Sequence, residues 1–291
     1  MKIGSLVNGI MARHRARLSP VPDVRDVGSH EPSPNELGIP ALGELATLIR
    51  ALKAPTVPLS TCSPLQTLIG MVLDESGSMQ AGAQQTIDGY NDQLATIRIG
   101  AVDIGCRVLQ VNFSSSASVI AEDAPVDGLS PLTLASYAPN SSTALYDTVA
   151  AVVKKLLSHR LAHDDNTSVL LTITTDGDDT SSSVWKTPDM TEFRALMKAV
   201  SENGRWTVAL AGPDSKLREF ADLMCVDRGN VAAFTPESLS SRDDLMFSSV
   251  QAMRGYVSSR ATGIRRSEDL YASSVSGHRA RAILDHEDGK R

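Results

Sequence analysis

The apolar positions of this 291-residue chain fall into two alternating patterns. Short runs of apolar and β-branched residues, typical of buried strands, cover 68–73, 108–113, 119–121, 169–175, 206–211 and 231–234. Apolar residues that recur every three or four positions predict helices over 83–97, 145–156, 190–203, 216–224 and 236–260. The alternation predicts an α/β fold with a doubly wound, mostly parallel central sheet, helices on both faces and one antiparallel edge strand at 119–121.

Composition divides the chain into three regions. Residues 1–60 are rich in Pro, Ser and charge and predict an N-terminal arm, with a short helix near 36–52 where leucines recur at helical spacing. We expect that helix to pack on the main domain, which spans 61–260. Residues 261–291 mix both charges with scattered Ser and Gly and predict a disordered C-terminal tail.

Carboxylate and hydroxyl side chains follow the ends of two predicted strands. Asp74-Glu75-Ser76-Gly77-Ser78 follows strand 68–73, and Asp176 follows strand 169–175. Between them in the sequence, Thr143 stands where the helix at 145–156 begins. Ligands of open α/β sheets bind beyond the carboxyl ends of the strands, and oxygen donors suit Mg²⁺, Mn²⁺ or Ca²⁺. The alternative is that Ser76 or Ser78 only caps the following helix.

These three stretches, in this order, resemble the metal-ion-dependent adhesion site (MIDAS) of von Willebrand factor A (vWA) domains, which have a Rossmann-like fold. The resemblance covers 67–234 and is to the bacterial members of that family. It implies a divalent ion, first of all Mg²⁺, with Mn²⁺ or Ca²⁺ as alternatives. The implied metal ligands are Asp74, Ser76, Ser78, Thr143 and Asp176.

The resemblance also implies a role in protein binding. In such sites a partner protein donates an Asp or Glu carboxylate that completes the coordination of the ion. Bacterial members are often partners of MoxR-type AAA+ ATPases or belong to stress-response complexes, so an adaptor role is expected first. The donor chemistry agrees: only Asp74 and Asp176 carry charge, and the octahedral shell that Mg²⁺ prefers leaves a position open.

Two other functions stay open from the sequence. An ion with an open position can activate water, but a hydrolase needs a general base, and the six histidines lie outside the three motif stretches. Glu75 is the one candidate base, and a solvent-facing side chain is the simpler interpretation. We therefore predict a protein that is not an enzyme. The other alternative is a structural component of a multimeric particle, such as a phage, with the arm and the tail making subunit contacts.

Three residues near the motifs have two interpretations each. Trp185 is either an exposed aromatic residue that anchors a partner beside the metal or a side chain tucked into the fold, and the second is favoured. Asp147 and Asp178 are close enough in sequence to the implied metal ligands to accept hydrogen bonds from them and so orient them. Helix capping or solvation explains both carboxylates equally well.

Charge and cysteine content narrow the functional classes. The net charge is −6 and no Lys/Arg run dominates, so we expect no nucleic-acid partner. No apolar stretch approaches the roughly twenty residues that span a bilayer, and the first residues are too polar for a signal peptide. The three cysteines argue against a disulfide framework. Together these features predict a cytoplasmic protein without a membrane partner.

Overall fold

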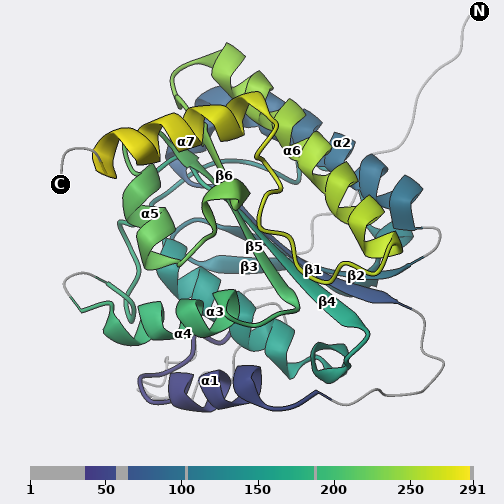
Figure 1. The fold of residues 1–291 in the computed structure, drawn as a ribbon. Helices are drawn as coiled ribbons and strands as arrows, with labels where there is room; N and C mark the ends of the chain where they lie inside the picture. The colour runs from purple at the N-terminus through teal and green to yellow at the C-terminus, as the bar shows by residue number, and fades with distance from the viewer. Residues whose placement is uncertain (1–36, 57–64, 102–103, 187–188, 289–291) are drawn as a thin grey trace, which may run out of the picture. The chain divides into compact units, whose positions relative to one another are not determined.

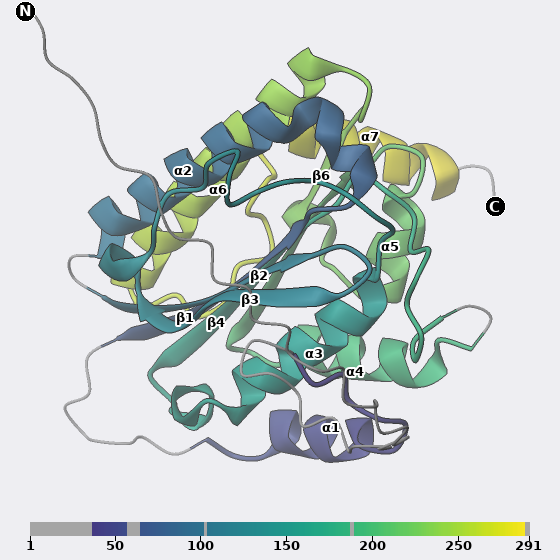
Figure 2. The same ribbon diagram turned by 180° about the vertical axis from the view of Figure 1, so that it is seen from behind.

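A six-stranded sheet forms the centre of the molecule (Figures 1 and 2). The computed structural model describes residues 37–56, 65–101, 104–186 and 189–288. The strand order is β3-β2-β1-β4-β5-β6, in which β3 pairs antiparallel with β2 and the other pairs are parallel. The strands are β1 Gln66–Asp74, β2 Gly105–Phe113, β3 Ala117–Pro125, β4 Thr167–Thr174, β5 Trp206–Pro213 and β6 Val231–Phe234. The expected fold class and its antiparallel edge strand are confirmed.

Helices cover both faces of this sheet. Helices α2 and α6 pack together on one face, and α3, α4 and α5 cover the other, with α1 packed on α3 and α4 (Figures 1 and 2). The α-helices are α1 Leu45–Lys53, α2 Ala83–Gly100, α3 Leu145–Ser158, α4 Thr191–Ser201, α5 Leu217–Leu223, α6 Leu239–Ala261 and α7 Val275–Asp288. Short 3₁₀ helices are η1 Gly77–Gly82, η3 Val126–Gly128, η4 Arg160–His163 and η5 Arg228–Asn230. Among the helices in the described ranges, none has both the length and the apolar character needed to cross a bilayer.

Strand β1 is buried on both faces, which explains its uninterrupted apolar sequence. Leu68 and Val72 pack in the cluster that contains α3, whereas Ile69 and Leu73 pack in the cluster beneath α2 and α6. At Gly70 a Cβ would lie 2.9 Å from Leu156 Cδ1, so glycine lets α3 approach the strand closely.

The direction of chain winding reverses between β1 and β4. From β1 the chain adds β2 and β3 on one side, and then crosses over to add β4, β5 and β6 on the other. The loops that leave the carboxyl ends of two adjacent strands therefore diverge at this point, which is where α/β sheets bind ligands. Asp74 ends β1, and Asp176 follows β4 by two residues.

The N-terminal helix is shorter than the sequence predicts. Helix α1 starts only at Leu45, after a turn in which Gly43 adopts φ +91°. Leu45 and Leu52 are buried, which confirms the expected packing on the main domain, whereas Leu42 is 70% exposed. The remainder of the predicted arm, 1–36 and 57–60, lies outside the described residues.

The prediction of a disordered tail at 261–291 is wrong for the described residues up to 288. Helix α7 packs beside β6 and α5 and also contacts α6 (Figure 1). Tyr271, Ala280 and Leu284 are buried, and Arg279 forms an ion pair with Asp214. The helix is hard to predict from the sequence because it has only a narrow stripe of small or branched apolar residues, and its other positions are mostly polar or charged.

Substitution of Gly277 tests the packing of α7. A Cβ on this residue would stand 1.8 Å from the carbonyl oxygen of Tyr271, a backbone atom that cannot swing aside. We expect Gly277→Ala to lower the free energy of unfolding by about 2 kcal/mol, measured by urea denaturation. Gly255→Ala in α6, where a Cβ meets nothing within 4 Å, is the control and should stabilise by about 0.5–1 kcal/mol. Equal stabilisation by both substitutions would contradict the packed helix.

Candidate metal-binding site

Asp74 is completely buried at the end of β1. Its Oδ1 accepts the backbone N–H of Ser76 at 2.7 Å, and its Oδ2 accepts the Thr175 hydroxyl at 2.6 Å. Burial raises the pKa of the Asp74 carboxyl from 3.8 to about 6, although these hydrogen bonds favour the charged form. The fold thus holds an oriented carboxylate in an environment where a negative charge is costly unless a cation accompanies it.

The Ser78 hydroxyl joins the first motif to the third. Its Oγ lies 3.1 Å from Ser76 Oγ and donates to Asp176 Oδ1 at 2.5 Å. The short helix η1 carries Ser78 back over the end of β1, and Asp176 arrives from the neighbouring strand. Side chains 98 positions apart in the sequence are therefore in direct contact.

Thr143 comes from the loop before α3 and lies near Ser78 at the same edge of the sheet. An added Cβ at Gly177 would stand 3.1 Å from Ser78 Oγ and 3.6 Å from Thr143 Oγ1, so both hydroxyls flank this glycine. Thr143 is fixed from behind: its N–H donates to Thr180 Oγ1 at 2.9 Å, and its carbonyl accepts the N–H of Thr180 at 2.8 Å. The N–H of Gly77 also bonds the carbonyl of Ser141 at 3.0 Å, which connects the first two loops.

The donor set fits a hard divalent ion. It consists only of oxygen atoms: two carboxylates, of Asp74 and Asp176, and the hydroxyls of Ser76, Ser78 and Thr143. Within the described ranges, no three or more His, Cys, Asp or Glu side chains are grouped in a way that could hold a metal. A softer ion that prefers nitrogen or sulfur therefore finds no such cluster in this part of the chain.

Arg242 forms a buried ion pair with Asp176, which the sequence pattern does not reveal. From the first turns of α6, Arg242 Nη2 donates to Asp176 Oδ2 at 2.6 Å, and both side chains are at most 2% exposed. In the sequence, Arg242 is only a charged residue among the hydroxyls of a helix. Tyr137, whose hydroxyl donates to the carbonyl of Asp74 at 2.6 Å, is equally inconspicuous there.

Asp147 and Trp185 have structural roles. The Asp147 carboxylate is buried and accepts the N–H groups of Ser183, Val184 and Trp185, so it holds the loop after the third motif. Trp185 is 1% exposed, which confirms the interpretation of a side chain tucked into the fold. Neither residue presents a surface to a partner.

Glu75 and Asp178 are engaged at the periphery. Glu75 Oε1 accepts the N–H of Ala138 at 2.6 Å, so it braces the neighbouring loop and is not a purely solvent-facing side chain. Asp178 forms an ion pair with Lys216 at 3.1 Å. Asp179, to which the sequence pattern assigns no role, accepts the N–H of Leu145 at 2.8 Å and so caps α3.

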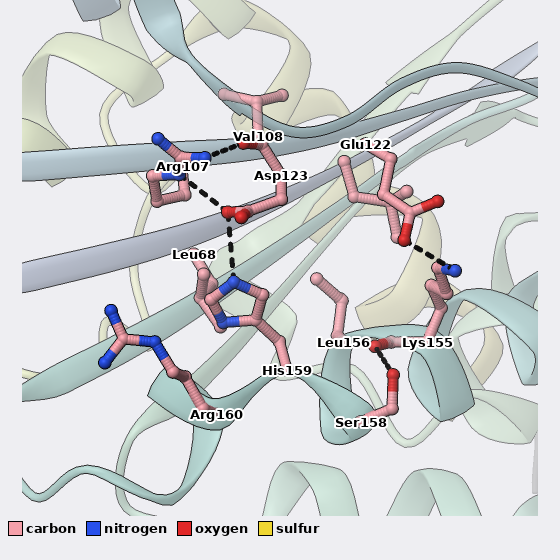
Figure 3. Close-up of a pocket in the computed structure, with 11 residues that line it drawn as sticks. Leu68, Arg107, Val108, Glu122, Asp123, Lys155, Leu156, Ser158, His159 and Arg160 are labelled. Carbon is pink, nitrogen blue, oxygen red and sulfur yellow. Dashed lines mark hydrogen bonds and ion pairs between the residues drawn. The ribbon is translucent and has the colours of Figure 1, made fainter.

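A separate cavity of about 350 Å³ lies between the β2–β3 hairpin and the C-terminal end of α3 (Figure 3). Two groups of its charged side chains bond one another: Asp123 contacts Arg107 at 2.6 Å and His159 at 3.0 Å, and Lys155 contacts Glu122 at 2.6 Å. It sits near the amino ends of the parallel strands, and none of its lining residues belongs to the three motifs. The cavity is therefore distinct from the candidate metal site.

Comparisons with known proteins give matches among solved structures. No protein-family model matches the chain, and no curated protein matches it. Von Willebrand factor type A from Catenulispora acidiphila is 14% identical with a TM-score of 0.40, over 65% of this chain and 43% of that chain. Proximal thread matrix protein 1 from the mussel byssus, with a zinc-occupied MIDAS motif, is 15% identical with a TM-score of 0.44, over 68% and 49%.

The ArnB paralog VWA2 from Sulfolobus acidocaldarius is also similar. It is 13% identical with a TM-score of 0.41, over 66% of this chain and 46% of that chain. The chain thus spans less than half the length of each of these three proteins.

Proposed function

We propose that this protein is a metal-dependent protein-interaction module. Asp74, Ser76, Ser78, Thr143 and Asp176 would hold a divalent ion, with Mg²⁺ as the first candidate and Mn²⁺ or Ca²⁺ as alternatives. A partner protein would donate an Asp or Glu carboxylate to it. The observation that carries the proposal is the Ser78 hydroxyl, which contacts Ser76 of its own loop and Asp176 of another. When bound, the ion supplies a positive charge with a coordination position left for an incoming oxygen.

The surroundings of the site favour binding over catalysis. Ser78 and Gly77 are exposed, so the mouth of the site is open to a partner. The Glu75 carboxylate, the one candidate base, is occupied by the N–H of Ala138. The described histidines lie just after α3, in η4 and on α7, on other parts of the fold. These features support a binding role over hydrolysis.

Calorimetric titration of the metal-stripped protein tests this proposal. We expect Mg²⁺ and Mn²⁺ to bind with a one-to-one stoichiometry to the wild type. Ser76→Ala/Ser78→Ala should weaken binding by more than about tenfold, because it removes two of the five oxygen donors. Ser158→Ala, an exposed serine at the far end of α3, is the matched control and should leave the Kd unchanged.

The partner is tested by capture from lysate on the wild type and on both serine variants. A partner that uses the ion is released by chelator and is absent from the Ser76→Ala/Ser78→Ala sample. The family resemblance makes a MoxR-type ATPase the first protein to look for. Absence of metal binding at millimolar concentrations would reject the module, and binding of one protein to all variants with or without chelator would reject the carboxylate bridge.

A further inference from the structure

The guanidinium of Arg242 is enclosed next to the candidate metal site. Its Nη2 donates to Asp176 Oδ2, its Nε donates to the carbonyl of Pro236 at 2.8 Å, and its Nη1 lies 3.8 Å from Met79 Sδ. The Cζ atom lies 5.4 Å from the centre of the Phe234 ring. The contacts come from η1, from β6 and from the loops after β4 and β6, and together they hold the guanidinium beside Asp176.

The path of this side chain is built into the sequence of η1. At Gly82 a Cβ would lie 2.4 Å from Arg242 Cδ and 2.6 Å from Cζ, so the arginine side chain fills the space that a larger residue at position 82 would need. Gly82 and the Phe234 ring both lie against the Arg242 side chain, which is only 2% exposed. The guanidinium is therefore buried beside the candidate site and paired with Asp176.

The two carboxylate oxygens of Asp176 have different hydrogen-bond partners. Oδ2 accepts a hydrogen bond from the guanidinium, while Oδ1 accepts one from the Ser78 hydroxyl. Asp74 and Asp176 together carry two negative charges, and Arg242 returns one positive charge. A divalent ion bound there would leave one net positive charge, whereas the same site without Arg242 would be neutral. A difference of one charge has a large effect on binding free energy in a buried environment, because water screens it little.

We propose that Arg242 determines the ligand selectivity of the site. Its charge lowers the affinity of the site for the ion by itself, and it favours an anionic oxygen ligand on the bound ion because that ligand neutralises the remaining positive charge. This inference rests on the proposed function, since it concerns the same ion and the same incoming carboxylate. The partner class it names is acidic, because a neutral amide or hydroxyl would leave the charge uncompensated.

Mn²⁺ titration with and without acetate tests this role. Acetate stands in for the partner carboxylate and is compared with chloride at matched ionic strength. For the wild type we expect acetate to raise the affinity for Mn²⁺. For Arg242→Met we expect Mn²⁺ alone to bind about tenfold tighter, because the repelling charge is gone, and acetate to have little further effect. Arg242→Lys keeps the charge and should behave as the wild type does.

Arg205→Met controls for the loss of a buried guanidinium. Arg205 holds the backbone carbonyls of Ala162, Asp164 and Thr167, away from the motifs, so its replacement should lower the melting temperature and leave the Kd for Mn²⁺ unchanged. A folded Arg242→Met variant with unchanged or weaker Mn²⁺ affinity would overturn the inference. If that variant does not fold, a wild-type affinity that ignores acetate overturns it equally. A wild type that binds no Mn²⁺ rejects the proposed function itself, which separates the two failures.

Discussion

Replacing Asp74 with Asn is expected to abolish metal binding and to stabilise the metal-free protein at neutral pH. The carboxylate is completely buried. Loss of a residue that only hydrogen-bonds to a metal ligand weakens metal binding roughly 10–100-fold, and loss of the Asp74 carboxylate should weaken Mg²⁺ or Mn²⁺ binding by more than that. At the same time, Asn keeps an oxygen for the N–H of Ser76 and carries no charge to desolvate. Loss of function would therefore accompany a gain in stability.

The pH dependence of this gain follows from the raised pKa of Asp74. In the unfolded chain the carboxyl ionises near 3.8, whereas the folded protein keeps its proton up to about 6. The folded state binds more protons between these values, so wild-type stability falls as the pH rises through this window and stays low above it. The full shift corresponds to about 3 kcal/mol. Asp74→Asn should thus exceed the wild type at pH above 6 and match it near pH 4.

Urea denaturation in chelator, at several pH values, measures this difference. Asp178→Asn is the matched control, because Asp178 is exposed and pairs with Lys216, and it should change neither metal affinity nor the pH profile appreciably. A metal-free Asp74→Asn protein that is less stable than the wild type above pH 6 would mean that the carboxylate is satisfied by the protein alone. The case for a cation at this position would then lose its electrostatic basis.

The strands and the motif residues are predictable because short-range patterns encode them. A strand buried on both faces has an uninterrupted apolar sequence, as β1 does, and residues that follow it must emerge at the carboxyl edge of the sheet. The sequence alone therefore predicts that Asp74 and Asp176 lie near each other, and Ser78 does contact Asp176. For these residues, position in the pattern determines position in space.

Arg242 and α7 escape prediction for a common reason. Their roles depend on contacts with distant segments: Arg242 meets an aspartate 66 positions away, and α7 buries Ala280 and Leu284 against β6 and α5. A buried arginine has the same local pattern as a solvated one, and a helix with a narrow apolar stripe resembles a charged tail. Only the assembled fold distinguishes these possibilities.

Asp147→Ala is expected to be among the most destabilising substitutions in the described part of the chain. The Asp147 carboxylate accepts the N–H groups of Ser183, Val184 and Trp185 at 2.6, 3.2 and 2.8 Å, and the Ser183 hydroxyl at 3.0 Å. Alanine leaves the buried N–H of Trp185 and the partly buried N–H groups of Ser183 and Val184 without this acceptor, at a cost of about 2–4 kcal/mol. Asp147→Asn keeps one acceptor oxygen and should lose about half as much.

Tryptophan fluorescence during urea denaturation separates loop release from general unfolding. Trp185 is buried behind the Asp147 anchor, so Asp147→Ala should shift its emission to longer wavelength even in the folded protein. The second tryptophan, Trp206, lies in β5 and is replaced by Phe in both proteins to isolate the signal. Glu192→Ala controls for the loss of a carboxylate near a helix N-terminus, because Glu192 is exposed in the first turn of α4. This substitution should lower the free energy of unfolding by no more than about 1 kcal/mol.

The outcome also bears on the metal site. Thr180 and Ser181, which hold the carbonyl of Thr143, precede the loop that Asp147 anchors. Release of that loop should therefore weaken Mn²⁺ binding in Asp147→Ala although no proposed ligand is altered. An Asp147→Ala protein with wild-type stability and unchanged Trp185 emission would contradict the anchoring role, because the buried N–H of Trp185 cannot lose its acceptor at no cost.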